Sequence, residues 1–159
     1  KIKSILSENG LAVDETGQGT VLERASMACP ALPTCGLALA ESERYVPEFL
    51  GLVDNLLDDA GLAGEEIIVR MTGCPNGCAR PYMAELGIVG KSPGKYAVYL
   101  GGNVAGTRLA RLYNQNVPAT EMTDHLRPLL ERYARYRRAG ERFGDFCARE
   151  VWPEIEVAI

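Results

Sequence analysis

Histidine and tryptophan occur once each in this sequence, and positive charge is in the minority. The 159 residues include 17 Lys and Arg against 21 Asp and Glu, which gives a formal net charge of −4 and a pI of about 5.1. A chain with this balance has no electrostatic basis for binding nucleic acid or an anionic membrane. The single histidine, His125, is interpreted as a surface residue of a helix rather than as a ligand.

Long apolar runs and a secretory signal are also missing. No apolar stretch reaches the roughly 18 residues that a membrane-spanning helix needs, and the opening KIKSILSENG is too polar for a signal peptide. The chain begins with Lys1 rather than Met, which is typical of a processed chain or an excised fragment. We therefore expect one domain without a membrane partner, in the cytoplasm or the plastid stroma, where thiols stay reduced.

Hydrophobic periodicity and turn residues predict a mixture of strands and helices. Runs rich in β-branched and aromatic residues predict strands over 24–27, 67–71, 86–89, 96–100 and 108–113. Apolar residues at helical spacing predict helices over 47–60, 79–85, 120–139 and 143–151, with a kink or a restart at Pro128. The expected fold class is α+β, with helices packed on a mixed, largely antiparallel sheet.

Cysteine is scarce, but four of the five cysteines form two close pairs. Cys29 and Cys35 are separated by five residues, and Cys74 and Cys78 by three. An odd number of cysteines without a secretory signal favours metal or catalytic thiols over a disulfide framework. Cys147 has no partner nearby in the sequence and follows two aromatic residues, Phe143 and Phe146, so we expect it to be a packed core thiol.

The spacing within each pair bears on which metal the thiols hold. Structural zinc sites favour shorter intervals, most often two residues on a tight knuckle. An iron–sulfur cube is wider, and each cysteine binds a different iron, so longer spacers reach around it. The turn MTGCPNGC (71–78) also contains Pro75 and Gly77, which suit close backbone approach to a cluster. A structural zinc module or a partner-binding domain remains the alternative from another class.

Four segments resemble the assimilatory sulfite reductase hemoproteins of the nitrite/sulfite reductase family. They are ACPALPTCGLALAESER (28–44), TGCPNGCARPYMAELGIVGKSPGKYAVYLGG (72–102), GTRLARLYNQNVP (106–118) and AGERFGDFC (139–147). Ferredoxin–nitrite reductases share the cysteine framework and are the nearest alternative. The resemblance implies the family's 4Fe-4S domain fold and an oxidoreductase that reduces sulfite to sulfide with six electrons.

The resemblance also implies roles for particular residues. Cys29, Cys35, Cys74 and Cys78 would bind a 4Fe-4S cluster, and the Cys78 thiolate would be shared with the iron of a siroheme. Asn76 would lie against the siroheme, and Thr72 and Arg80 could face the carboxylates of the macrocycle.

The family's proteins are longer than this chain, so residues 1–159 resemble their C-terminal part. The implied partners are the N-terminal half of the same hemoprotein, sulfite, and an electron donor that is either ferredoxin or an NADPH-dependent flavoprotein. The sequence has no obvious cluster of basic residues beside its cysteine motifs, so we expect the groups that bind sulfite to come from the other half.

Overall fold

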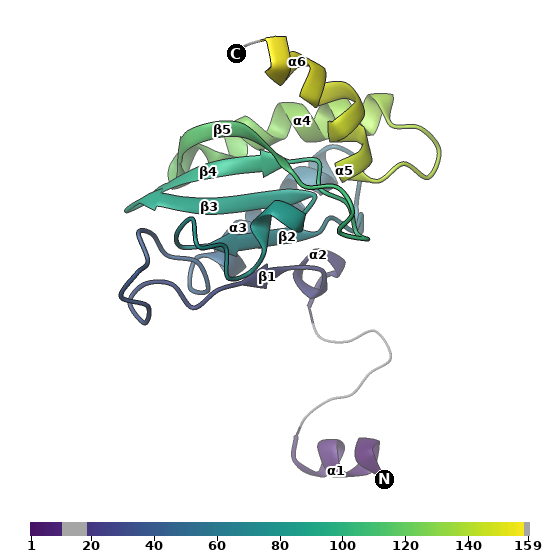
Figure 1. The fold of residues 1–159 in the computed structure, drawn as a ribbon. Coiled ribbons are helices and arrows are strands. Elements are labelled where there is room, and N and C mark those ends of the chain that lie inside the picture. Colours follow the sequence, from purple (N-terminus) through teal and green to yellow (C-terminus); the bar gives the residue numbers. More distant parts are fainter. Residues whose placement is uncertain (11–18, 158–159) are drawn as a thin grey trace.

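The computed structural model describes residues 1–10 and 19–157, and Figure 1 shows their arrangement. α1 buries none of its residues and lies apart from the rest of the structure. The elements are α1 (Ile2–Glu8), α2 (Val21–Arg24), β1 (Met27–Ala28), α3 (Val46–Asp59), β2 (Val69–Thr72), η1 (Pro81–Met83), β3 (Leu86–Ser92), β4 (Lys95–Leu100), β5 (Arg111–Pro118), η2 (Ala119–Glu121), α4 (Met122–Tyr136), α5 (Phe143–Phe146), η3 (Cys147–Val151) and α6 (Trp152–Val157).

The five strands form one mixed sheet in the order β1-β2-β3-β4-β5. β1 pairs with β2 and β2 with β3 in parallel, whereas β3 with β4 and β4 with β5 are antiparallel. The predicted α+β class is confirmed. Antiparallel pairing joins the three longest strands, and the shorter β1 and β2 form a parallel edge.

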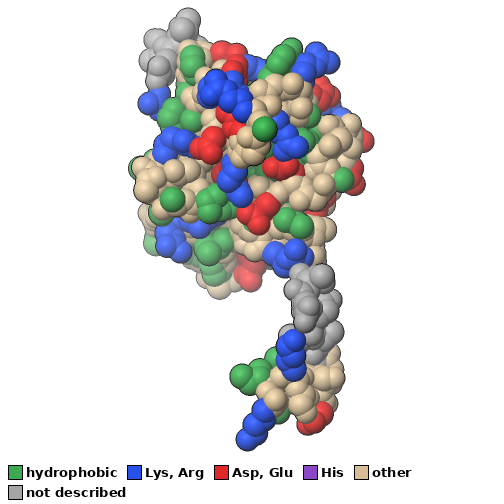
Figure 2. Space-filling view, turned by 90° about the vertical axis from the view of Figure 1, so that its right-hand side faces the viewer, with side chains coloured by type: hydrophobic (Ala, Val, Ile, Leu, Met, Phe, Trp, Pro, Cys, Tyr) green, Lys and Arg blue, Asp and Glu red, His purple; other side chains and the backbone are tan. Residues whose placement is uncertain are grey.

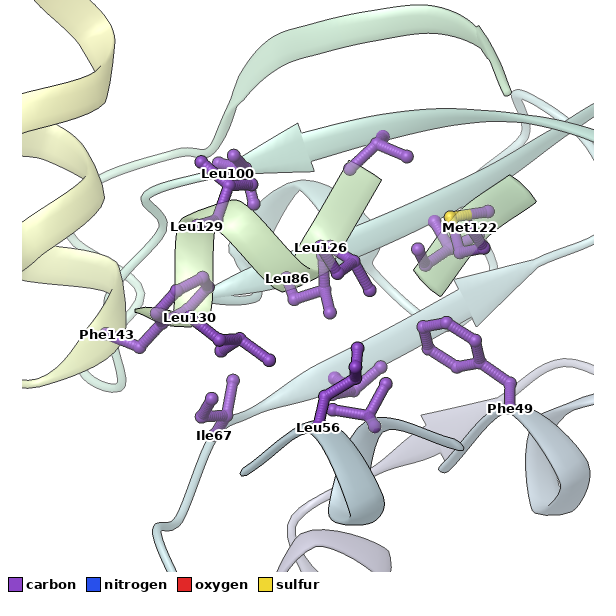
Figure 3. Close-up of a cluster of buried hydrophobic side chains, with 14 of the residues drawn as sticks. Phe49, Leu56, Ile67, Leu86, Leu100, Met122, Leu126, Leu129, Leu130 and Phe143 are labelled. Atoms are coloured by element: carbon purple, nitrogen blue, oxygen red, sulfur yellow. The ribbon is translucent and has the colours of Figure 1, made fainter. Parts of the chain in front are cut away.

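The core lies between one face of this sheet and the helices α3 and α4 (Figure 3). Alternate strand residues such as Met71, Ile88 and Val98 point into it and are fully buried. Phe49 and Leu56 contribute from α3, and Leu126 from α4. Within the described residues, no helix combines the length and the apolar character needed to cross a bilayer.

The opposite face of the sheet is covered by the segment that contains η1. A side chain at Gly87 of β3 would come within 2.3 Å of the Pro81 carbonyl oxygen, so the segment lies directly against the strand. Tyr82 packs its ring edge-on against Tyr99 of β4, with 5.0 Å between the ring centroids. This packing holds the residues that follow Cys78 against the sheet.

Two predicted elements near the cysteines differ from the structure. The strand predicted over 24–27 starts only at Met27, because a capping box of Thr20 and Glu23 begins the helix α2, which includes Arg24. β1 is consequently reduced to two residues. The helix expected over 79–85 is only the short 3-10 turn η1, since Arg80 before it has a left-handed backbone, with a φ of 54°.

Two further expectations concern the second half of the chain. The strand predicted over 108–113 begins later, at Arg111, and extends to Pro118. α4 runs through Pro128 as one helix, without the restart that the proline suggested. The helix expected over 143–151 is confirmed in place, although it consists of α5 followed by the π-helical η3. Cys147 is fully buried in it, as predicted, and burial raises the pKa of its thiol.

A buried carboxylate ties the C-terminal helices to the sheet. Glu85 is 1% exposed and accepts backbone hydrogen bonds from Ile68 at 2.9 Å and Gly144 at 3.1 Å. The Arg142 guanidinium donates to both carboxylate oxygens, at 3.1 and 2.8 Å. The face of the molecule shown in Figure 2, seen from the right-hand side of Figure 1, intersperses acidic and basic side chains and carries no patch of a single sign.

We expect Glu85→Gln to lower the free energy of unfolding by about 2–3 kcal/mol, because it leaves buried donors and a partly buried guanidinium without their anion. Urea denaturation followed by circular dichroism measures the loss. Glu154→Gln is the matched control. Glu154 also binds an arginine, Arg132, through both oxygens, but its side chain is 60% exposed, so its loss should cost less than about 1 kcal/mol. Equal losses in the two variants would contradict the assignment.

Candidate metal and cofactor site

Cys29 and Cys74 leave the carboxyl ends of neighbouring parallel strands. Ala28 at the end of β1 is paired with Met71 of β2, and the Cys29 N–H donates to the Met71 carbonyl at 3.1 Å. Cys74 follows the end of β2 by two residues. Because strands of the same direction end at the same edge of a sheet, residues 45 positions apart in the sequence start their loops side by side. These loops lie at the left-hand end of the sheet in Figure 1.

Gly73 joins the two loops. Its N–H donates to the Cys29 sulfur at 3.3 Å, and its carbonyl accepts hydrogen bonds from Leu39 at 2.8 Å and Ala40 at 3.0 Å. A Cβ atom at this position would lie 2.5 Å from the Ala31 Cβ and 2.6 Å from the Ala40 carbonyl oxygen. Only glycine allows this approach, which brings the loop that carries Cys35 back to the end of β2.

The loop after Cys29 is fixed by its own backbone and by β2. The Cys35 N–H donates to the Ala31 carbonyl at 2.7 Å, and Ala31 has a left-handed φ of 49°. Ser42, at the far end of the loop, is buried and donates its hydroxyl to the Met71 carbonyl at 2.8 Å. Residues 29–35 form turns and no regular helix.

Cys74 and Cys78 lie on the same turn, but their side chains differ in exposure to solvent. Cys74 is buried and Cys78 is exposed. Gly77 between them has a φ of 70°, and its carbonyl accepts the Arg80 N–H at 2.7 Å. Tyr82 supports the turn by donating its hydroxyl to the Pro75 carbonyl at 3.2 Å. Burial, together with Tyr99 and the nearby Cys74, raises the pKa of Tyr82, so the hydroxyl stays protonated as the donor.

The other predicted cofactor residues surround this turn. Asn76 and Arg80 are exposed, whereas Thr72 is 1% exposed and its hydroxyl is buried without a hydrogen-bond partner among the described residues. The expectation that the groups that bind sulfite come from the other half stays a prediction. Burial and, to a smaller extent, the charge of Arg80 lower the pKa of Arg70 on β2.

All five cysteines are free thiols. In the part of the chain that the structure describes, no three His, Cys, Asp or Glu side chains converge as a group that could hold a metal ion. The loops that carry the two cysteine pairs meet at Gly73, whose N–H donates to the Cys29 sulfur at 3.3 Å.

Sequence reasoning missed two residues of this region. Gly90 of β3 lies against the same junction, because a side chain there would come within 2.4 Å of the Gly73 carbonyl oxygen. Nothing local to the sequence reveals that contact. Arg70 had a usable signal, since it is the one charged residue in the otherwise apolar strand IIVRM (67–71).

Comparison with known proteins gives a consistent result. Residues 24–155 match the family described as the nitrite and sulphite reductase 4Fe-4S domain. The sulfite reductase (NADPH) hemoprotein beta-component of Staphylococcus carnosus is 53% identical over 150 residues, which are 94% of this chain and 26% of that protein. The protein of the same name from Chromohalobacter salexigens is 56% identical over 134 residues, or 84% of this chain and 23% of that protein.

A solved structure shares the fold at lower identity. The NirA protein of Mycobacterium tuberculosis superposes with a TM-score of 0.73 at 24% identity, covering 93% of this chain and 29% of that one. The chain thus spans about a quarter of the length of the curated relatives it matches.

Proposed function

Because the chain belongs to the nitrite and sulphite reductase 4Fe-4S domain family, we propose that it is the cluster-carrying part of a longer hemoprotein that reduces sulfite to sulfide. One observation carries the proposal most directly. Cys29 and Cys74 start from adjacent parallel strand ends, and the Gly73 N–H between them donates to the Cys29 sulfur. A hydrogen bond of this kind stabilises a thiolate ligand and tunes the potential of a cluster.

The residues present fit a 4Fe-4S cluster and a siroheme. Cys29, Cys35, Cys74 and Cys78 are the proposed cluster ligands, all of them free thiols on two loops that meet at Gly73. The exposed Cys78 would also hold the siroheme iron, and Asn76, exposed on the same turn, would lie against the macrocycle. Thr72 and Arg80 supply a hydroxyl and a cation for its carboxylates.

When bound, the two cofactors supply electron storage and transfer to the substrate. The chain's own contribution is positional. Gly77, with its positive φ, adds no side-chain bulk to the turn between Cys74 and Cys78, and Tyr82 braces that turn. Gly73 keeps the Cys35 loop against the end of β2.

The reaction itself sets what the rest of the hemoprotein must supply. Sulfur passes from oxidation state +4 in sulfite to −2 in sulfide, so each turnover takes six electrons, and seven protons yield three waters and hydrosulfide. We propose that the N-terminal part supplies the groups that bind sulfite and deliver protons. The relatives' name favours an NADPH-dependent donor over ferredoxin, and their bacterial origin favours the cytoplasm over the plastid.

Turnover by the longer hemoprotein tests this function. With an excess of reduced methyl viologen under anaerobic conditions, six electrons should be consumed for each sulfide formed, and sulfite should be a better substrate than nitrite. Efficient nitrite reduction with negligible sulfite reduction would favour the nitrite reductase alternative. Steady sulfide production by residues 1–159 alone would contradict the need for the other half.

A further inference from the structure

The turn between Cys74 and Cys78 carries an asparagine followed by a glycine. Asn76 is exposed, and Gly77 has no side chain to hinder an approach to its backbone nitrogen. An asparagine in this setting can react with the next residue. The Gly77 nitrogen attacks the Asn76 Cγ, the new C–N bond closes a succinimide ring, and the Cγ–Nδ2 bond breaks to release ammonia, which takes the Gly77 proton. Water then opens the ring to give aspartate or isoaspartate.

The closed turn holds the two reacting groups apart. The Gly77 N–H donates to the Cys74 carbonyl, so residues 74–77 form a β-turn with Pro75 at its second position. Asn76 is not among the residues with a positive φ, so the turn is of type I. At the third position of a type I turn ψ is about 0°, which aligns the Asn76 nitrogen, and not its Cβ, with the Gly77 nitrogen. Succinimide formation therefore requires the turn to open.

Two weak contacts keep the turn closed. The hydrogen bond from Gly77 to Cys74 is 3.4 Å long, against roughly 2.9–3.0 Å for a typical backbone bond. The Tyr82 hydroxyl donates to the Pro75 carbonyl at 3.2 Å, in an exposed position. Exposed turns with such bonds open locally at a small cost in free energy. A cluster bound to both cysteines would restrain the turn, because Cys74 is its first residue and Cys78 follows its last.

We propose that Asn76 is a site of spontaneous deamidation in the cofactor-free protein, and that binding of the cluster suppresses the reaction. The protection rests on the proposed function, since it requires Cys74 and Cys78 to be cluster ligands. The reaction consumes water and yields ammonia, so it proceeds without an enzyme or an oxidant. The turn thereby limits how long the chain can remain without its cofactors.

Deamidation would also impair the binding of the cofactors. Isoaspartate at position 76 adds a methylene group to the main chain between Cys74 and Cys78, and so changes the spacing of two proposed ligands. Either product places a carboxylate where the neutral amide of Asn76 stood, beside the site proposed for an anionic macrocycle. The modified chain should therefore take up less iron and sulfide.

Peptide mass spectrometry of the longer hemoprotein, prepared with and without its cofactors, tests the site. Both forms are incubated under reducing, anaerobic conditions, and conversion of Asn76 to aspartate or isoaspartate is followed over time. Asn76 should convert at least about tenfold faster in the cofactor-free form, because ligated cysteines suppress local opening. Asn9 is the internal reference, since Asn9-Gly10 is the same dipeptide at the end of α1, apart from the cysteine loops. Its rate should be the same in both forms.

Tyr82→Phe tests the contact that braces the turn. Loss of its hydrogen bond to Pro75 should speed the conversion of Asn76 about fivefold in the cofactor-free protein and leave the cofactor-bound rate unchanged. Tyr99→Phe is the matched control, because it removes a hydroxyl from the ring that packs against Tyr82 and leaves the bond to the turn in place. Asn76→Gln should keep its capacity to take up iron and sulfide throughout the incubation, because the longer side chain forms a cyclic imide much more slowly.

The possible results separate the site from the proposed function. Equal rates at Asn76 with and without cofactors would overturn the proposal, and so would a parallel change at Asn9, which would indicate general unfolding of the cofactor-free protein. Loss of iron uptake at the native rate in Asn76→Gln would overturn the link between deamidation and cofactor binding. Rapid deamidation in a native protein that has bound neither iron nor sulfide after reconstitution would support the site and contradict the proposed function.

Discussion

Cys74→Ala is expected to abolish incorporation of the iron–sulfur cluster. Cys74 is buried and is one of the four proposed ligands, so its replacement leaves the cluster one thiolate short. Iron and acid-labile sulfide should fall from about four of each per chain to near zero after anaerobic purification or reconstitution. Cys29→Ala and Cys35→Ala should have the same effect, because each removes one of the four proposed ligands.

Cys147→Ala is the control for these variants. Cys147 is also a buried free thiol, but it lies in η3 among core residues, away from the cysteine loops. Its replacement should lower the free energy of unfolding by about 1 kcal/mol, as expected for loss of a small buried group, and leave the iron content unchanged. A full complement of iron and sulfide in the Cys74→Ala variant, or its loss in Cys147→Ala, would contradict the assignment of the ligands.

Gly73→Ala is expected to have the second large effect, on the fold and the cluster together. The added methyl group would meet the Ala31 Cβ and the Ala40 carbonyl oxygen, and neither belongs to a flexible side chain that could move away. We expect a loss of about 3 kcal/mol in unfolding free energy, at the upper end of the usual cost of overpacking. The loop that carries Cys35 would be displaced, so the iron content should fall as well.

Gly51→Ala provides the contrast. Gly51 lies on the exposed side of α3, and a side chain there would meet nothing within 4 Å. Alanine at this helical position should raise the free energy of unfolding by about 0.5–1 kcal/mol and leave the iron content intact. Chemical denaturation and iron analysis of both variants measure the difference. If the two substitutions behave alike, Gly73 does not have the role that its contacts suggest.

The parts of the fold that the sequence predicted well are those with a strong local pattern. α3 was expected over 47–60 and spans Val46–Asp59, since Phe49, Val53 and Leu56 repeat at helical spacing and Gly61 follows. β3 and β4 were expected because two apolar runs flank the turn at Pro93 and Gly94.

The errors fall where distant contacts or capping decide the structure. β1 has only two residues and exists because β2, some 40 positions later, supplies its hydrogen bonds, which no local window contains. The residues just before β1 form the helix α2, because Thr20 and Glu23 cap its N-terminus. The shift of β5 follows from its pairing with β4, where Arg111 opposes Leu100.

The residues of the candidate site could likewise be predicted only in part from the sequence. The four cysteines could be selected from spacing and resemblance, and their roles as ligands remain predictions. The packing of the segment after Cys78 on β3 could not be found, because it is visible only in the close approach of Gly87 to the Pro81 carbonyl. No local pattern in the sequence contains that contact.

The central claim is tested most directly by the metal content of the native chain. Iron, zinc and acid-labile sulfide are measured per chain on protein purified anaerobically, and a visible spectrum is recorded from the same sample. The account predicts about four irons and four sulfides with broad sulfur-to-iron absorption, either as purified or after reconstitution. One zinc per chain with no sulfide, persisting through anaerobic reconstitution with iron and sulfide, would contradict it.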